Sequence, residues 1–202
     1  MQPFVVGIGG GSGAGKTTLA RRLAERVEPG RPALLVELDW YYRDLGGLSL
    51  DERARTNFDH PDALDWPLLL EQVGSLRQGL AVERPAYDFA SHTRLAQRVP
   101  AEPTPVMVVE GLLALHDPSL RALLDLKVYV DARRDVRLSR RRRRDVEERG
   151  RTPESVTAQF AATVDPMHAQ YVEPSRASAD LIADGCLDVD RVVEAVFGLL
   201  QR

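Results

Sequence analysis

The chain has 202 residues, 44% of them apolar and 28% charged, which is enough to bury the core of one domain. Its formal net charge of −3 provides no general attraction to nucleic acid or anionic membranes, and no apolar run approaches the roughly 18 residues of a membrane span. Cys186 is the single cysteine, which excludes an intrachain disulfide and a cysteine-based zinc cluster. We expect one cytoplasmic domain, residues 1–202, that binds neither nucleic acid nor membranes.

Short β-branched runs alternate with longer helix-like stretches. In chain order, the pattern predicts a strand at 4–8, a helix at 16–27, a strand at 33–38, a helix at 67–77, strands at 106–109 and 126–130, helices at 133–148 and 153–171, a strand at 179–183 and a helix at 189–200. The strands are nearly continuous apolar runs, which is typical of a parallel sheet buried between helical layers. The sequence therefore indicates the α/β class, with a parallel five-stranded sheet flanked by helices.

Residues 82–103 interrupt this alternation. The segment contains Pro85, Pro100 and Pro103, and its polar and apolar residues alternate. A period of two is typical of a strand with one exposed face. We therefore predict a β-hairpin inserted outside the main sheet.

The segment Gly10-Gly11-Ser12-Gly13-Ala14-Gly15-Lys16-Thr17 matches the phosphate-binding P-loop, G-x-x-x-x-G-K-[ST], between a predicted strand and a predicted helix. Glycines let the backbone turn its N–H groups toward the phosphates. Lys16 is suited to bridge the β- and γ-phosphates, and the Thr17 hydroxyl to bind Mg²⁺. We expect a P-loop NTPase-type fold in which this loop, together with Thr18, binds ATP and Mg²⁺.

GTPases share such a loop, and residues 44–47 match the D-x-x-G of a GTPase switch. The guanine-reading motif N-K-x-D is absent, however, because Asn57 is the only asparagine and Phe58 follows it. The sequence therefore favours a kinase.

Two acidic residues follow predicted strands, at the edge where open α/β sheets bind their ligands. Asp39 follows the strand at 33–38, and Glu110 follows the strand at 106–109. Either could simply cap a turn. Phosphoryl transfer, however, needs a metal ligand and a group that accepts the proton of the attacking hydroxyl. We assign Glu110 to the metal and Asp39 to the proton.

Arginines crowd the predicted helix at 133–148 and continue to Arg149 and Arg151. The five consecutive arginines at 140–144 point to every side of a helix, so they cannot all contact one ligand. Arg137, Arg141 and Arg144 share one face, which we expect to close over phosphates as a lid at about 133–151. The other arginines are expected to be solvated or paired with nearby acids. An RNA-binding surface is the alternative, but the helix lacks interleaved aromatic residues.

Five further segments carry a recognisable pattern: residues 39–43, 57–63, 85–94, 110–115 and 144–151. Together they resemble the uridine-cytidine kinase family of P-loop kinases, over about residues 5–184. That family transfers the γ-phosphoryl group of ATP to the 5′-hydroxyl of uridine or cytidine, giving UMP or CMP. The resemblance implies the same reaction here, with ATP and Mg²⁺, a nucleoside-binding hairpin and a homotetramer.

The resemblance also implies roles for individual residues. Asp39 is the expected general base, Thr17 and Glu110 the expected Mg²⁺ ligands, and Lys16, Arg144 and Arg149 the expected phosphate contacts. Asp59 and Arg141 are expected at the ribose hydroxyls, with Gln159 nearby, and His60 is expected to be structural. The residues expected around the base are Tyr42, Phe58, Tyr87, His92 and Arg151. The alternatives are a related P-loop kinase acting on phosphoribulose or pantothenate, and a non-catalytic RNA-binding module.

Overall fold

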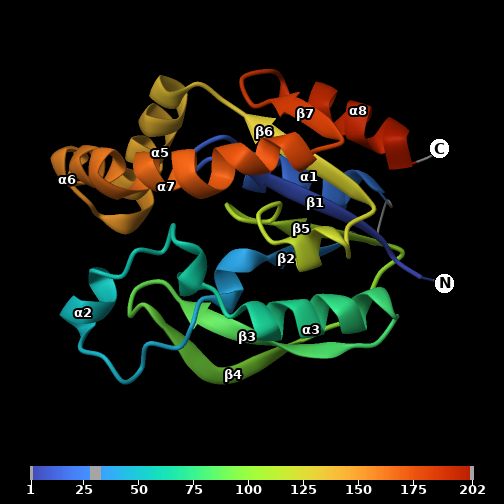
Figure 1. Ribbon diagram of the computed structural model, residues 1–202, viewed down its shortest axis with the longest axis horizontal. Coiled ribbons are helices and arrows are strands. Elements are labelled where there is room, and N and C mark those ends of the chain that lie inside the picture. The colour runs from blue at the N-terminus through green and yellow to red at the C-terminus, as the bar shows by residue number, and fades with distance from the viewer. Residues whose placement is uncertain (1, 28–32, 201–202) are drawn as a thin grey trace.

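The computed structural model describes residues 2–27 and 33–200 (Figure 1). Within these residues, the central sheet has five parallel strands in the order β2-β5-β1-β6-β7. Their bounds are β1 Phe4–Gly10, β2 Leu34–Glu37, β5 Val106–Glu110, β6 Leu126–Asp131 and β7 Leu181–Asp184. The predicted α/β class and the five-stranded parallel sheet are confirmed. Because the strands are parallel, their carboxyl ends meet at one edge of the sheet.

Helices cover both faces of this sheet. Their bounds are α1 Lys16–Val27, α3 Trp66–Arg77, α5 Arg134–Arg149 and α8 Val189–Leu200, with short helices α2 Leu50–Ala54 and α4 Pro118–Arg121. On one face, Leu23 and Val196 pack in a buried cluster with Val6. On the other face, Leu69 of α3 packs in a second cluster with Val5. Successive side chains of a strand point to opposite faces, which is why β1 is apolar throughout.

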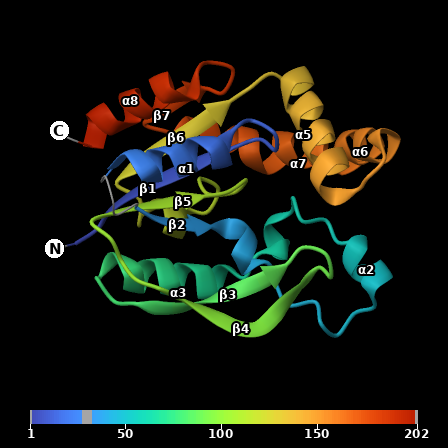
Figure 2. The same ribbon diagram turned by 180° about the vertical axis from the view of Figure 1, so that it is seen from behind.

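The segment after α3 forms the predicted hairpin, which lies apart from the main sheet (Figure 2). Strands β3, Val82–Asp88, and β4, Thr93–Ala101, pair antiparallel as a separate two-stranded sheet. The pairing is irregular between Pro85 and Tyr87, where the proline has no N–H to donate.

The predicted helix at 153–171 is helical but not regular. Helix α6, Pro153–Gln159, continues into a π turn at Phe160–Val164, helix α7 at Asp165–Met167, a second π turn at His168–Val172 and a 3₁₀ turn at Glu173–Ser178. Pro166 explains the first π turn, because proline has no N–H and its ring crowds the carbonyl four residues earlier. Each π turn changes which side chains face the sheet, and a uniform helical period does not predict this change.

Other departures from the predicted elements occur in connecting segments. The second strand ends at Glu37 rather than Leu38, because a 3₁₀ turn, Leu38–Tyr41, begins there. Helix α2 is not predicted by the apolar pattern, although Ser49 and Glu52 form a capping box that the sequence displays. Within residues 2–27 and 33–200, no helix combines the length and apolar character needed to cross a membrane.

Candidate active site

The P-loop, residues 10–17, connects the carboxyl end of β1 to α1. Gly13 has a φ of 79°, and a Cβ at this position would lie 2.3 Å from the carbonyl oxygen of Arg137. The loop is therefore packed against α5 so closely that a side chain at position 13 has no room. Lys16 is buried, and its Nζ donates a 3.1 Å hydrogen bond to the carbonyl oxygen of Gly11. The ammonium group thus lies within the loop, where P-loop proteins bind polyphosphates.

Thr17 and Glu110 meet where α1 begins and β5 ends. Thr17 Oγ1 donates a 2.8 Å hydrogen bond to Glu110 Oε1, whereas Glu110 Oε2 is buried and has no hydrogen-bond partner among the described residues. Burial raises the pKa of Glu110 to about 7, although the Lys16 ammonium opposes this effect. A hydroxyl and a carboxylate with an unpaired oxygen are ligands that Mg²⁺ accepts, so this pair fits the predicted ion.

Among the residues that the structure describes, this pair is not part of a larger metal-binding cluster of protein side chains. In the part of the chain that the structure describes, no cluster of three or more His, Cys, Asp or Glu side chains could hold a metal. An ion at Thr17 and Glu110 would therefore complete its shell with phosphate oxygens and water, as Mg²⁺ commonly does in nucleotide sites.

Asp39 lies in the 3₁₀ turn that follows β2, and its neighbours in this turn are firmly held. Tyr41 Oη donates a 2.9 Å hydrogen bond to Gln72 Oε1 of α3. Arg94 of β4 donates a 3.2 Å hydrogen bond from Nη2 to the Tyr41 carbonyl oxygen. The sheet, α3 and the hairpin together hold the backbone that carries Asp39.

One lysine and three carboxylates share this edge of the sheet. Burial lowers the pKa of Lys16, and the carboxylates of Glu110, Asp39 and Asp59 oppose that effect. Burial raises the pKa of Asp59, the Arg141 guanidinium opposes the rise, and the Asp39 carboxylate adds to it. Charges that act on one another in this way lie close together, although they come from four separate segments of the chain.

Arg141 of α5 spans the distance between the P-loop and the loop at residues 57–63. Its Nη1 donates a 2.9 Å hydrogen bond to Ser12 Oγ and lies 4.0 Å from Asp59 Oδ1. Its Nη2 donates a 3.1 Å hydrogen bond to Gln159 Oε1. The structure therefore brings together Asp59 and Arg141, the two residues expected at the ribose hydroxyls, and Gln159, which is expected nearby.

Four aromatic side chains, from Tyr42, Phe58, Tyr87 and His92, cluster between the 57–63 loop and the hairpin. The His92 ring stacks on Phe58 with centroids 5.3 Å apart, and Tyr42 meets Phe58 and Tyr87 edge-on at 4.9 and 5.4 Å. His92 has a φ of 52°, a strained conformation that occurs more often at functional sites. Tyr87 Oη is buried with no hydrogen-bond partner among residues 2–27 and 33–200. This cluster suits a planar ring with a polar edge.

In the arginine-rich segment, residues 133–151, one carboxylate organises the guanidinium groups. Asp145 is fully buried, at 0% exposure, and its oxygens lie 3.2 to 3.5 Å from nitrogens of Arg141, Arg144, Arg149 and Arg151. Four positive charges around one negative charge leave a net positive charge beside the P-loop. Arg151 Nη1 also donates a hydrogen bond to Gln159 Oε1, so Arg151 lies beside the side chain that Arg141 contacts.

Two other arginines of α5 have partners that the sequence does not predict. Arg140, expected to be solvated or paired with an acid, donates from Nη1 to the carbonyl oxygens of Ala14 and Gly185 at 3.2 and 2.8 Å. Arg137, expected on the phosphate-facing side, is buried against the P-loop, and its Nη2 lies 3.8 Å from Asp165 Oδ1. Both side chains support the P-loop from outside.

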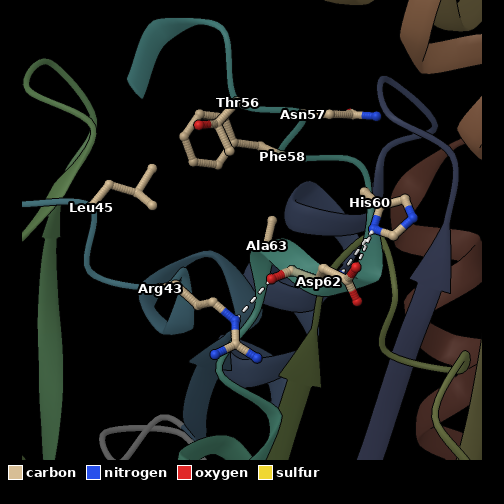
Figure 3. A pocket seen from close by; sticks show the side chains of 8 residues that line it. All are labelled: Arg43, Leu45, Thr56, Asn57, Phe58, His60, Asp62 and Ala63. Atoms are coloured by element: carbon tan, nitrogen blue, oxygen red, sulfur yellow. Dashed lines mark hydrogen bonds and ion pairs between the residues drawn. The ribbon is translucent and has the colours of Figure 1, made fainter. Parts of the chain in front are cut away.

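A cavity of about 260 Å³ lies beside the 57–63 loop (Figure 3). Its lining consists of Arg43, Leu45, Thr56, Asn57, Phe58, His60, Asp62 and Ala63. Phe58 belongs both to this lining and to the aromatic cluster, but Lys16, Asp39 and Glu110 do not line the cavity. Arg43 Nε closes one side by donating a 2.9 Å hydrogen bond to the Asp62 carbonyl oxygen. The cavity therefore adjoins the aromatic cluster and is separate from the P-loop.

Comparison with protein families matches residues 5–191 to the family described as Phosphoribulokinase / Uridine kinase family. A uridine kinase of Halobacterium salinarum is 49% identical over 89% of this chain and 79% of its own length. A uridine kinase of Chloroflexus aurantiacus is 45% identical over 98% of this chain and 97% of its own length. A uridine kinase of Alkaliphilus metalliredigens is 44% identical over 100% and 98%, respectively.

Solved structures resemble the chain in fold. A protein described provisionally as a fructose transport system kinase, from Silicibacter sp. TM1040, superimposes with a TM-score of 0.72 and 22% identity over 90% of this chain and 89% of its own. A possible uridine kinase from Bacillus stearothermophilus superimposes with a TM-score of 0.59 and 20% identity over 91% and 90%, respectively.

Proposed function

Because this chain belongs to the phosphoribulokinase and uridine kinase family, we propose that it is an ATP-dependent uridine kinase that phosphorylates the 5′-hydroxyl of uridine or cytidine. The observation that carries this proposal is the gathering of Lys16, Asp39, Asp59 and Glu110 at one edge of the sheet, beside an aromatic cluster. Relatives that are 40 to 49% identical and are named uridine kinases support the choice of nucleoside.

The donor site of the proposed reaction consists of the P-loop and the adjoining arginines. Backbone N–H groups of residues 11–15 and the Lys16 ammonium would bind the β- and γ-phosphates of ATP. Arg144 and Arg149 would stabilise the negative charge of the group in transfer. Thr17 and Glu110 would hold the Mg²⁺ that accompanies ATP, and a bound Mg²⁺ supplies positive charge that offsets the repulsion between the phosphates and the incoming oxygen.

On the acceptor side, Asp39 would take the proton of the 5′-hydroxyl. The hydroxyl oxygen forms a bond to the γ-phosphorus while the bond from that phosphorus to the leaving oxygen of ADP breaks. Asp39 suits this role because it lies near Lys16 and its backbone is held by α3 and the hairpin. General base catalysis of this kind typically contributes a factor of about 10² to 10⁴.

The remaining polar and aromatic groups would recognise the nucleoside. Asp59 and Arg141 are 4.0 Å apart, so both retain hydrogen-bonding capacity that ribose hydroxyls can use, with Gln159 beside them. A 2′-deoxynucleoside would leave these buried groups unpaired and is therefore disfavoured. Tyr42 and Phe58 would contact the faces of the base, and Tyr87 Oη and His92 its polar edge. Arg151, which donates a hydrogen bond to Gln159, would complete the surroundings of the base.

We extend the proposal to the state of the protein: a cytoplasmic homotetramer in which residues 1–202 form one domain. The family resemblance supports this extension. Light scattering on the purified chain would measure a mass four times that of the chain if the tetramer forms, and a mass equal to one chain would contradict it.

The experiment that tests the activity is ADP release with ATP and Mg²⁺ against a panel of acceptors. The panel contains uridine, cytidine, 2′-deoxycytidine, thymidine, adenosine, pantothenate and ribulose 5-phosphate. We expect turnover with uridine and cytidine and little with the others. Turnover with pantothenate or ribulose 5-phosphate alone would contradict the nucleoside assignment and leave a P-loop kinase with a different acceptor.

A further inference from the structure

The hydrogen bonds of His60 indicate which ring nitrogen carries the hydrogen in the neutral imidazole. Its Nδ1 accepts a 3.1 Å hydrogen bond from the backbone N–H of Asp62, at the start of the 3₁₀ turn Pro61–Ala63 (Figure 3). Nδ1 therefore carries no proton, and the neutral ring has its proton on Nε2. His60 Nε2 lies 2.8 Å from Tyr171 Oη, so in this tautomer the Nε2–H donates a hydrogen bond to the tyrosine hydroxyl oxygen.

Tyr171, the partner of His60 in this bond, is held in place by contacts of its own. It lies in the second π turn and packs against the core cluster that α3 covers. Its ring meets the rings of His60 and His116 edge-on, with centroids 5.0 and 5.5 Å apart. Its Oη also accepts a 3.0 Å hydrogen bond from Gln170 Nε2. Single π turns within helices are rare and occur frequently at functional sites.

The bond between His60 and Tyr171 connects two sides of the candidate site. Tyr171 belongs to the helical run that begins with α6 and carries Gln159, whose side chain bonds to Arg141. His60 directly follows Asp59, whose carboxylate faces the same arginine at 4.0 Å. A displacement of His60 therefore moves the Asp59 carboxylate relative to Arg141 and Gln159.

The other side-chain bonds to this loop point in a different direction. Arg43 donates to the Asp62 carbonyl oxygen, and Trp66 Nε1 of α3 donates to the Pro61 carbonyl oxygen at 2.9 Å. These two bonds hold the 57–63 loop toward α3 and toward the segment that follows the 3₁₀ turn Leu38–Tyr41. His60 holds the loop toward the helical run on the opposite side, so the position of Asp59 depends on both sets of bonds.

We propose that His60 and Tyr171 are positioning residues that set the distance between Asp59 and Arg141, and thereby the preference for ribonucleosides over 2′-deoxynucleosides. The inference rests on the proposed function and identifies how its ribose specificity is maintained. Neither residue contacts the nucleoside in this account. Both act through Asp59.

The test compares uridine with 2′-deoxyuridine in three variants. Tyr171→Phe removes the hydroxyl and keeps the ring against His60 and His116. His60→Asn keeps an acceptor for the Asp62 N–H, since asparagine caps helical turns well, but is too short to reach Tyr171. The double variant measures whether the two residues act as a pair.

We expect each single variant to lower kcat/KM for uridine by about five- to tenfold, the effect of losing one hydrogen bond. The preference for uridine over 2′-deoxyuridine should fall by a similar factor, because the deoxynucleoside lacks a hydroxyl that the displaced groups recognise. The KM for ATP should stay within about twofold of the wild-type value, because the P-loop does not depend on this bond. The double variant should lose no more of its kcat/KM for uridine than either single variant does.

Tyr129→Phe is the matched control, because it also removes a tyrosine hydroxyl, one that donates a 3.1 Å hydrogen bond to Glu173 and none to the 57–63 loop. It should retain the wild-type nucleoside preference. An unchanged preference in Tyr171→Phe and His60→Asn, or an equal loss with both nucleosides, would overturn the inference. If Tyr171→Phe does not fold, as judged by thermal denaturation, His60→Asn decides alone. Wild-type protein that uses neither uridine nor cytidine would instead refute the proposed function.

Discussion

Thr17 Oγ1 lies 2.8 Å from Glu110 Oε1, and this hydrogen bond connects the first turn of α1 to the carboxyl end of β5. The two residues are 93 positions apart in the chain. They meet because β1 and β5 pair in parallel, with Ile8 opposite Glu110, so the P-loop and Glu110 leave the sheet at the same edge. The pairing of two strands therefore brings a hydroxyl, a carboxylate and the Lys16 ammonium into one small volume.

Asp39→Asn tests the proposed general base. The amide cannot accept the proton of the 5′-hydroxyl, so we expect kcat to fall by about 10²-fold or more. The affinity for ATP, measured by calorimetry, should change little, because Asp39 is not expected to bind the phosphates. Asp51→Asn, at an exposed position of α2, is the control and should behave as wild type. A kcat for Asp39→Asn within threefold of the control would contradict the assignment.

Glu110→Gln tests the electrostatics of the metal-ligand pair in protein free of ATP and metal. Burial raises the pKa of Glu110 from 4.5 to about 7, so the folded chain holds this proton more tightly than the unfolded chain does. Wild-type stability should therefore decrease as the pH rises from 4.5 through 7, and the glutamine variant should lack this decrease. The free energy of unfolding of the variant, relative to wild type, should rise over this range by up to about 3 kcal/mol.

Urea unfolding at several pH values, with a chelator present, measures this difference. If the difference in free energy of unfolding between variant and wild type does not change with pH, Glu110 ionises in its ordinary range.

Asp145→Asn tests the buried carboxylate at the centre of the arginine-rich segment. Removal of the charge leaves four guanidinium groups without their common partner, and breaking a buried ion pair typically costs about 3 to 5 kcal/mol. We expect a lower melting temperature and a fall in kcat of about tenfold or more, because Arg144 and Arg149 lose their orientation. Asp135→Asn removes an exposed ion pair with Arg133 and should change stability by less than about 0.5 kcal/mol. Equal effects of the two substitutions would argue against an organising role for Asp145.

His92→Ala tests the assignment of the base site. We expect it to change the ratio of kcat/KM for uridine and cytidine, which differ at one polar edge of the ring, far more than the KM for ATP. Leu95→Ala, at an exposed position of the same hairpin, is the control and should leave the ratio unchanged. If His92→Ala also leaves the ratio unchanged, His92 has no part in reading the base.

The sequence predicts the parts of this site that depend on short segments. The P-loop is recognised from eight consecutive residues, 10–17, and the strands before Asp39 and Glu110 are recognised from their apolar runs. The hairpin can be predicted because its alternating polar and apolar residues differ from the apolar strands and helical stretches around it. The matching structural elements are confirmed, whereas the roles assigned to individual side chains stay predictions.

Features that depend on three-dimensional pairing could not be predicted in this way. Local patterns do not encode the strand order, so the contact of Thr17 with Glu110 follows only from the pairing of β1 with β5. The sequence does not show that Arg140, in a run of five arginines, bonds to backbone carbonyls. Nor does it show that Asp145 is the shared partner of Arg141, Arg144, Arg149 and Arg151. The π turns at Phe160–Val164 and His168–Val172 likewise change the phase of a helix that a uniform period describes as continuous.

Identification of the product of the reaction tests the central claim most directly. The chain is incubated with ATP, Mg²⁺ and uridine, and the product is examined by phosphorus NMR, with 5′-deoxyuridine as the matched acceptor that lacks the reacting hydroxyl. We predict uridine 5′-monophosphate and equimolar ADP from uridine, and no nucleotide product from 5′-deoxyuridine. Phosphate on a different hydroxyl, or ADP formed at the same rate with either compound, would contradict the account.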